Sequence, residues 1–177
     1  MATLIIIAYA DEYCNRFYAV TKKYLKPLYI SCFLCYTYRI MTKDKIFEFI
    51  KEQKTAFLSS VDENGFPVTR AMLAPRKFDG NAVYFSTNTS SRKVAQLSAD
   101  SKACVYFYKR GRFKYTGVTL LGTAEICTDQ PTKDEIWRVG DGMFYKKGKT
   151  DPDYCVIKFT AIEAEYYCDL KVERIVL

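Results

Sequence analysis

One stretch of the chain decides the fold: Tyr84-Phe85-Ser86-Thr87-Asn88-Thr89-Ser90-Ser91-Arg92-Lys93-Val94-Ala95-Gln96-Leu97. It begins as a strand, because its first residues and the two that precede them are apolar, aromatic or β-branched. Small polar residues follow, and a helix then opens with Val94 and Leu97 on one face. The sequence therefore predicts a strand, a polar loop and a helix in succession.

The start of this helix has the composition of a phosphate site. The first N–H groups of a helix lack partners within it and carry the positive end of its dipole. We expect Ser90 or Ser91 to cap the helix by accepting a hydrogen bond from one of them. Arg92 and Lys93 add two cations where the helix itself disfavours them, and a bound anion would remove this conflict. The alternative is a capped surface helix with two solvated basic residues.

The sequence on both sides of this stretch is typical of hairpins. The turns 62–65 and 79–81 contain Asn-Gly and Asp-Gly, which favour tight connections. Strands are predicted over 55–61, 66–73, 82–85, 103–108, 115–127, 154–160 and 163–168, and helices over 42–53, 91–98 and 131–139. This spacing indicates a mainly β (α+β) fold built as a small antiparallel barrel with short helices.

Residues 1–40 differ in pattern from the rest of the chain. Their two apolar runs, 4–8 and 28–38, are shorter than the roughly 18–20 residues that cross a bilayer. No basic segment precedes the first run, as a signal peptide would require. We expect 41–177 to form the domain. Residues 1–40 would be an N-terminal extension, either from an upstream translation start or as a peripheral addition to the domain.

The amino-acid composition indicates which classes of binding partner to expect. The chain has 177 residues, of which 49% are hydrophobic, so it can bury the core of one domain. Its net charge of +7 is spread without a dense basic run, which argues against nucleic-acid binding and fits a bound anionic cofactor. Neither a membrane nor a nucleic acid is an expected partner.

The chain has seven cysteines and no histidine. An odd number of cysteines without a secretion signal predicts reduced thiols in the cytoplasm. The close pair Cys32 and Cys35 has no second pair and no histidine beside it, so no metal site is expected. The absence of histidine also removes the usual general base. Chemistry must then rest on a cofactor or on Tyr, Cys, Lys and carboxylates, and no catalytic residue is assigned.

Several motifs stand in a fixed order along the chain: Arg70-Ala71-Met72-Leu73, then the strand 83–88, Ser91-Arg92-Lys93, Val105-Tyr106-Phe107 and Gly122-Thr123-Ala124-Glu125. In this order, residues 41–177 resemble the pyridoxamine 5'-phosphate oxidase-like family of FMN-binding split barrels. The ending, from Asp151-Pro152-Asp153-Tyr154 to Glu163-Ala164-Glu165-Tyr166-Tyr167, is similar to the short, general-stress-protein branch of that family.

The resemblance implies an antiparallel split β-barrel with short flanking helices that binds FMN at the interface of a homodimer. It also implies that the strand 70–73 lies along the flavin and contacts it through its backbone. The cofactor-binding residues that it implies are Arg70, Ala71, Met72, Leu73, Ser86, Thr87, Ser91, Arg92 and Lys93. Among them, Arg92 and Lys93 match the family's phosphate-binding pair, and Arg70 matches a phosphate or flavin contact.

The chain also departs from that family's true oxidases. Ala74-Pro75-Arg76 stands where they often have a lysine, a glutamine of their long strand is replaced near Gly117, and the segment that holds pyridoxal phosphate is missing. We therefore do not expect vitamin B6 oxidation. The expected function is that of an FMN-dependent oxidoreductase, with its small-molecule substrate and electron donor unassigned. The alternatives are a non-catalytic FMN-binding stress-response protein and a barrel that has lost the flavin, and the phosphate pocket argues against the latter.

Overall fold

The computed structural model describes residues 41–111, 115–168 and 170–177. These residues belong to one compact unit, Met41–Leu177. The predictions for residues 1–40, including the pair Cys32 and Cys35, lie outside the described residues.

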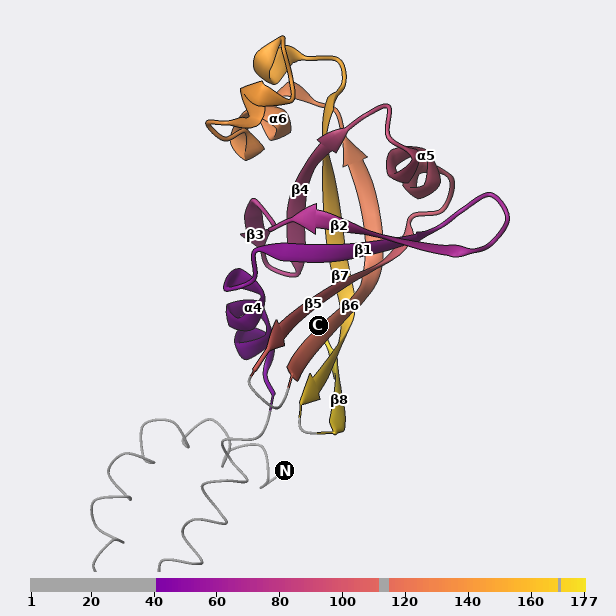
Figure 1. Ribbon diagram of the computed structural model, residues 1–177, viewed down its shortest axis with the longest axis vertical. Helices are drawn as coiled ribbons and strands as arrows, with labels where there is room; N and C mark the ends of the chain where they lie inside the picture. The colour runs from indigo at the N-terminus through magenta and orange to yellow at the C-terminus, as the bar shows by residue number, and fades with distance from the viewer. Residues whose placement is uncertain (1–40, 112–114, 169) are drawn as a thin grey trace, which may run out of the picture. The chain divides into compact units, whose positions relative to one another are not determined.

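Within these residues the unit is mainly β-sheet with three short α-helices, as predicted (Figure 1). The strands are β1 (Thr55–Val61), β2 (Pro67–Leu73), β3 (Lys77–Asp79), β4 (Ala82–Asn88), β5 (Lys102–Arg110), β6 (Tyr115–Cys127), β7 (Tyr154–Cys168) and β8 (Lys171–Val176). The helices are α4 (Lys43–Lys51), α5 (Arg92–Ala99) and α6 (Gln130–Ile136), and the 3-10 turns η1 (Asp141–Met143) and η2 (Gly148–Thr150) follow α6.

All strands join one antiparallel sheet in the order β2-β1-β5-β6-β7-β4-β3, and β8 pairs with β7. Strand twist accumulates across such a sheet, and in Figure 1 β1 and β2 run across the direction of β6 and β7. The edge strands β2 and β3 are not paired with each other in the described part of the chain. The sheet thus forms the antiparallel split barrel that the resemblance implied.

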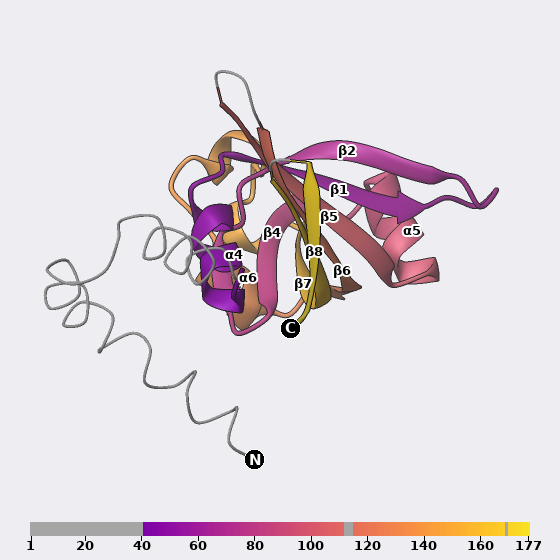
Figure 2. The same cartoon turned by 90° about the horizontal axis from the view of Figure 1, so that it is seen from below.

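The core lies inside this curled sheet and under α4. Alternation along β4 and β5 turns residues such as Val83, Phe85 and Phe107 inward, where they are almost fully buried. Helix α4 is capped by Thr42, whose hydroxyl accepts a hydrogen bond from the Lys45 amide, and it buries Ile46, Phe47 and Ile50. Figure 2 shows α4 and α5 beside different parts of the sheet, and α5 packs near β1 and β6.

The end of the chain differs from the sequence prediction. The two strands expected over 154–160 and 163–168 form one strand, β7, and β8 was not predicted. The apparent break is a β-bulge, because Gly122 pairs with Ala161 while Leu121 pairs with Glu163, which leaves Ile162 without a partner on β6. The extra residue reverses the alternation of side chains, and this reversal mimics the end of a strand in the sequence.

A second apolar cluster lies beneath α6 and η1 and centres on Tyr154, which is 1% exposed. The ring of Tyr154 lies 4.7 Å from that of Tyr145 and 5.2 Å, edge-on, from that of Trp137. Burial raises the pKa of Tyr154 to about 12, and the carboxylate of Asp141 adds to this rise.

We expect Tyr154→Phe to make the protein less sensitive to alkali. The unfolded chain releases the phenolic proton near pH 10, whereas the folded chain retains it. This contribution to stability is complete below about pH 10 and is lost as the pH rises towards about 12. Between these values the thermal midpoint should therefore fall further in the wild type than in Tyr154→Phe. Equal falls in wild type and Tyr154→Phe would refute the assignment.

Candidate anion-binding site

The predicted strand, loop and helix are present as β4, residues 89–91 and α5. At the end of β4, Thr87 is buried and Ser86 half-buried, and they pair with Cys155 and Val156 of β7. Helix α5 buries Val94 and Leu97 against the sheet. The sheet on one side and the helix core on the other therefore fix both ends of the loop.

The loop itself is held by Asp153. Its carboxylate accepts hydrogen bonds from the Asn88 side-chain amide and the Ser90 backbone N–H, both at 2.8 Å. The Thr89 N–H donates to the Asp153 carbonyl at 2.8 Å. These bonds to Asn88 and Ser90 lower the pKa of the Asp153 carboxyl. This role of Asp153 was not predicted, and the signal for it is the position of Asp153 directly before β7, the strand that pairs with β4.

Ser91 occupies the N-cap position of α5, but the predicted cap hydrogen bond is wrong. Its hydroxyl donates to the Asn88 carbonyl at 2.7 Å and accepts nothing from the first turn. The tight turn of the loop places the Asn88 carbonyl next to the Ser91 hydroxyl. The hydroxyl therefore donates to this carbonyl and does not cap the first turn of the helix. Among the described residues, the backbone N–H groups of Arg92 and Lys93 have no acceptor. Two free donors therefore remain at the positive end of the helix.

Three cations gather around this helix start. Burial, followed by the charge of Arg92, lowers the pKa of Arg70. Burial, followed by the charge of Arg70, lowers the pKa of Lys93. Arg92 is largely exposed, and within the described residues its one ion pair is with Glu63, at 4.0 Å. No carboxylate pairs with Arg70 or Lys93 anywhere in the described ranges, so their repulsion is uncompensated and a bound anion would relieve it.

Strand β2 carries Arg70, one of the three cations. Its side chains alternate, with Arg70 and Met72 turned inward and Ala71 and Leu73 exposed on the other face. Met72 packs against the main core. Since β2 pairs only with β1 in the described residues, the backbone groups along its other edge are free to meet a ligand. The fold thus brings Arg70 to Arg92 and Lys93, while the side chains of Ala71 and Leu73 point away from them.

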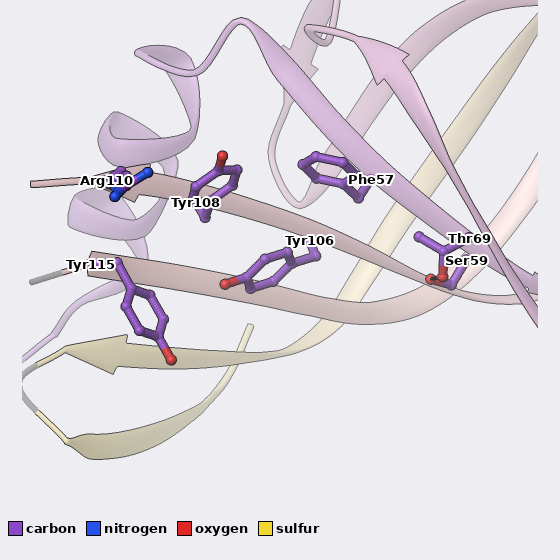
Figure 3. A pocket seen from close by; sticks show the side chains of 7 residues that line it. All are labelled: Phe57, Ser59, Thr69, Tyr106, Tyr108, Arg110 and Tyr115. Atoms are coloured by element: carbon purple, nitrogen blue, oxygen red, sulfur yellow. Dashed lines mark hydrogen bonds between the residues drawn. The ribbon is translucent and has the colours of Figure 1, made fainter.

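The opposite face of β1, β2, β5 and β6 carries an open aromatic pocket of about 600 Å³, shown in Figure 3. The rings of Tyr106 and Tyr108 lie parallel, 6.4 Å apart. Gly117 leaves room for the side chain of Tyr106, because a Cβ at Gly117 would lie 2.6 Å from the Tyr106 hydroxyl oxygen. The pocket, which we call the aromatic face, is lined by Phe57, Ser59, Thr69, Tyr106, Tyr108, Arg110 and Tyr115. The aromatic strand 105–108 indicates part of this surface from the sequence, but the pocket as a whole is not visible there, because its residues come from four strands.

The family model for pyridoxamine 5'-phosphate oxidase matches residues 42–168. The chain belongs to this family. The match confirms the resemblance inferred from the ordered motifs and covers most of the unit described above. No curated protein matches the chain.

Solved structures from this family share the split-barrel fold. A protein from Clostridium acetobutylicum related to general stress protein 26 is 35% identical, with a TM-score of 0.67, over 76% of this chain and 93% of its own. General stress protein 26 from Bacillus anthracis is 24% identical, with a TM-score of 0.63, over 76% and 98%. An FMN-binding family protein from Nostoc punctiforme is 14% identical, with a TM-score of 0.61, over 78% and 98%.

The described residues contain neither a membrane-spanning helix nor a cluster of metal ligands. None of the helices there is long and apolar enough to cross a membrane. No group of three or more histidine, cysteine or acidic side chains is placed there to hold a metal ion. We call the three cations and the free N–H groups at the start of α5 the anion site. This site is the feature that indicates a function.

Proposed function

We propose that this protein binds FMN non-covalently and uses it as an oxidoreductase acting on a small molecule. The observation that carries the proposal is the pair of partly buried cations, Arg70 and Lys93, which have no carboxylate partner in the described part of the chain and lie near two free backbone N–H groups. Burying like charges together without a counter-charge is unfavourable unless an anion joins them. A phosphate monoester dianion meets this requirement.

The residues present fit FMN. The ammonium of Lys93, the guanidinium groups of Arg70 and Arg92, and the free N–H groups of α5 would hold the phosphate. Ser86 and Thr87, at the end of β4, and the free backbone edge of β2 would meet the rest of the cofactor. When bound, the flavin supplies hydride and electron transfer, and the protein supplies orientation and electrostatics.

The proposal predicts that FMN binds at least about tenfold more tightly than riboflavin. Riboflavin lacks the phosphate, and one charge-assisted hydrogen bond contributes about 1.5–3 kcal/mol, where about 1.4 kcal/mol is tenfold. The visible spectrum of the purified protein and fluorescence titrations of the apo form with both ligands test it. Equal dissociation constants would rule out a phosphate-directed site.

We further propose that a second copy of the chain covers the aromatic face and completes the site. An exposed aromatic surface of this kind is typical of an interface. Thr69 of this face alternates along β2 with Arg70 of the anion site, so one strand would join the dimer contact to the cofactor.

This arrangement predicts that FMN tightens the dimer, because a ligand shared by two chains links binding to assembly. Sedimentation of apo and FMN-loaded protein across a dilution series measures the linkage. Tyr106→Arg should shift both forms towards monomer by placing charges opposite each other across the two-fold axis. Lys149→Glu on η2, which packs against α6 and does not line the aromatic face, is the control. Loaded protein that sediments as a monomer at all concentrations would contradict the shared site.

A second candidate is an FMN-binding stress protein without turnover. It is favoured by the names of the C. acetobutylicum and B. anthracis relatives, which refer to a general stress protein. The two candidates differ in one measurement, the oxidation of a reduced nicotinamide by the FMN-loaded protein with an electron acceptor present. Steady turnover supports the oxidoreductase, and its absence over a panel of acceptors supports the stress protein.

A further inference from the structure

Arg70 is held in place by two uncharged side chains. Its Nη1 donates to the Ser60 hydroxyl at 2.7 Å, and its Nη2 donates to Oε1 of Gln96 at 2.8 Å. The Ser60 hydroxyl in turn donates to the same Oε1 at 2.7 Å. Because a guanidinium only donates, it is the oxygen of the Gln96 amide that faces Arg70. The three side chains form a closed triangle of hydrogen bonds.

The triangle connects the elements that build the anion site. Ser60 lies on β1, Arg70 on β2, and Gln96 on α5, the helix that begins with Arg92 and Lys93. Ser60 and Gln96 are 2% and 7% exposed, so neither is free to contact a ligand in solvent. Gln96 therefore ties the strand that carries Arg70 to the helix that carries Lys93.

Arginine side chains buried in proteins are usually matched by a carboxylate. Here both acceptors are neutral, and a glutamine stands where a glutamate of nearly the same shape could form an ion pair. A glutamate would hold Arg70 equally well but would cancel its charge. The lowered pKa of Arg70, caused by burial and by Arg92, is consistent with a charge left uncompensated.

We propose that Ser60 and Gln96 are positioning residues that fix the Arg70 guanidinium while leaving its full charge for the dianionic phosphate of the ligand. The inference rests on the proposed binding of FMN. It makes the neutrality of position 96, in addition to its hydrogen bonds, a determinant of selectivity for phosphorylated over unphosphorylated flavin.

Gln96→Glu tests the proposal, with titrations of FMN and riboflavin and the thermal midpoint of the apo protein as readouts. We expect the FMN dissociation constant to rise at least about tenfold while that of riboflavin changes less than about twofold. The apo midpoint should not fall, because the new carboxylate pairs with Arg70. Gln53→Glu adds the same charge just after α4 and is the control for the titrations. It is not a control for the midpoint, because a carboxylate cannot donate to the Phe49 carbonyl as the Gln53 side chain does.

Ser60→Ala is the second variant and remains decisive if Gln96→Glu fails to fold. It retains all charges but leaves Nη1 of Arg70 without its acceptor, so FMN binding should weaken severalfold and riboflavin binding should be unchanged. A purely structural role would lower the apo midpoint and weaken both ligands alike, which would overturn the proposal. Unaltered selectivity in both variants would overturn it as well. If the wild type itself does not distinguish FMN from riboflavin, the proposed function fails instead.

Discussion

Replacing Arg70 with leucine and Lys93 with methionine together is expected to weaken FMN binding by about 100-fold or more. Each side chain can give the phosphate a charge-assisted hydrogen bond, worth about 1.5–3 kcal/mol. Losing two such bonds corresponds to about two orders of magnitude or more at about 1.4 kcal/mol for each. Riboflavin binding should change little, because riboflavin carries no phosphate for these cations. Isothermal titration of the apo protein with both ligands measures the difference.

A control for this variant removes two cations elsewhere. Lys171→Met with Arg174→Leu makes the same change in charge on β8, where Arg174 forms surface ion pairs with Glu163 and Glu165. Its FMN affinity should stay near that of the wild type. A Lys93→Met apo protein should melt no lower than the wild type at neutral pH, since the lowered pKa of Lys93 means that folding disfavours its charged form. An equal loss of both ligands in the Arg70 and Lys93 variant would count against the phosphate role.

Gly122→Ala is expected to destabilise the fold by about 3 kcal/mol or more, at the upper end of what overpacking does. A Cβ at Gly122 would overlap the Thr160 carbonyl oxygen and lie 3.0 Å from the Cα of Ala161. These are backbone atoms of the β6–β7 pair, so no rotamer change can make room. For a unit of this size the thermal midpoint should fall by about 10 °C or more.

Substitutions at Gly142 and Gly117 are the controls for the expected effect of Gly122→Ala. Gly142→Ala meets nothing within 4 Å and should leave the midpoint almost unchanged. Gly117→Ala meets only the ring of Tyr106, which can move, so its cost should be intermediate. Scanning calorimetry of the three variants gives the order. A Gly122→Ala protein as stable as Gly142→Ala would show that the bulge does not require close backbone approach.

Several parts of this protein could be predicted from residues that are neighbours along the chain. The succession of β4, loop and α5 follows from apolar and polar residues that lie within a few positions of one another. The turn before β2 follows from Asn64-Gly65, with Gly65 at a φ of 83°. Alternation is enough to place Arg70 and Met72 on the same face of β2. The ordered motifs were sufficient to identify the family.

The hydrogen bonds between residues far apart in the chain could not be predicted and are seen in the folded structure. Asp153 accepts hydrogen bonds from Asn88 and Ser90, and Gln96 accepts one from Arg70. No local sequence pattern predicts these hydrogen bonds, because the partners lie far apart in the chain. The same holds for the bulge at Ile162, where the close approach of β6 breaks the alternation of β7. A hydroxyl or an amide accepts whichever partner the fold brings nearest, so its sequence neighbours do not specify its role. The cations of the anion site can thus be identified from the sequence, whereas the groups that hold them in place are identified from the folded structure.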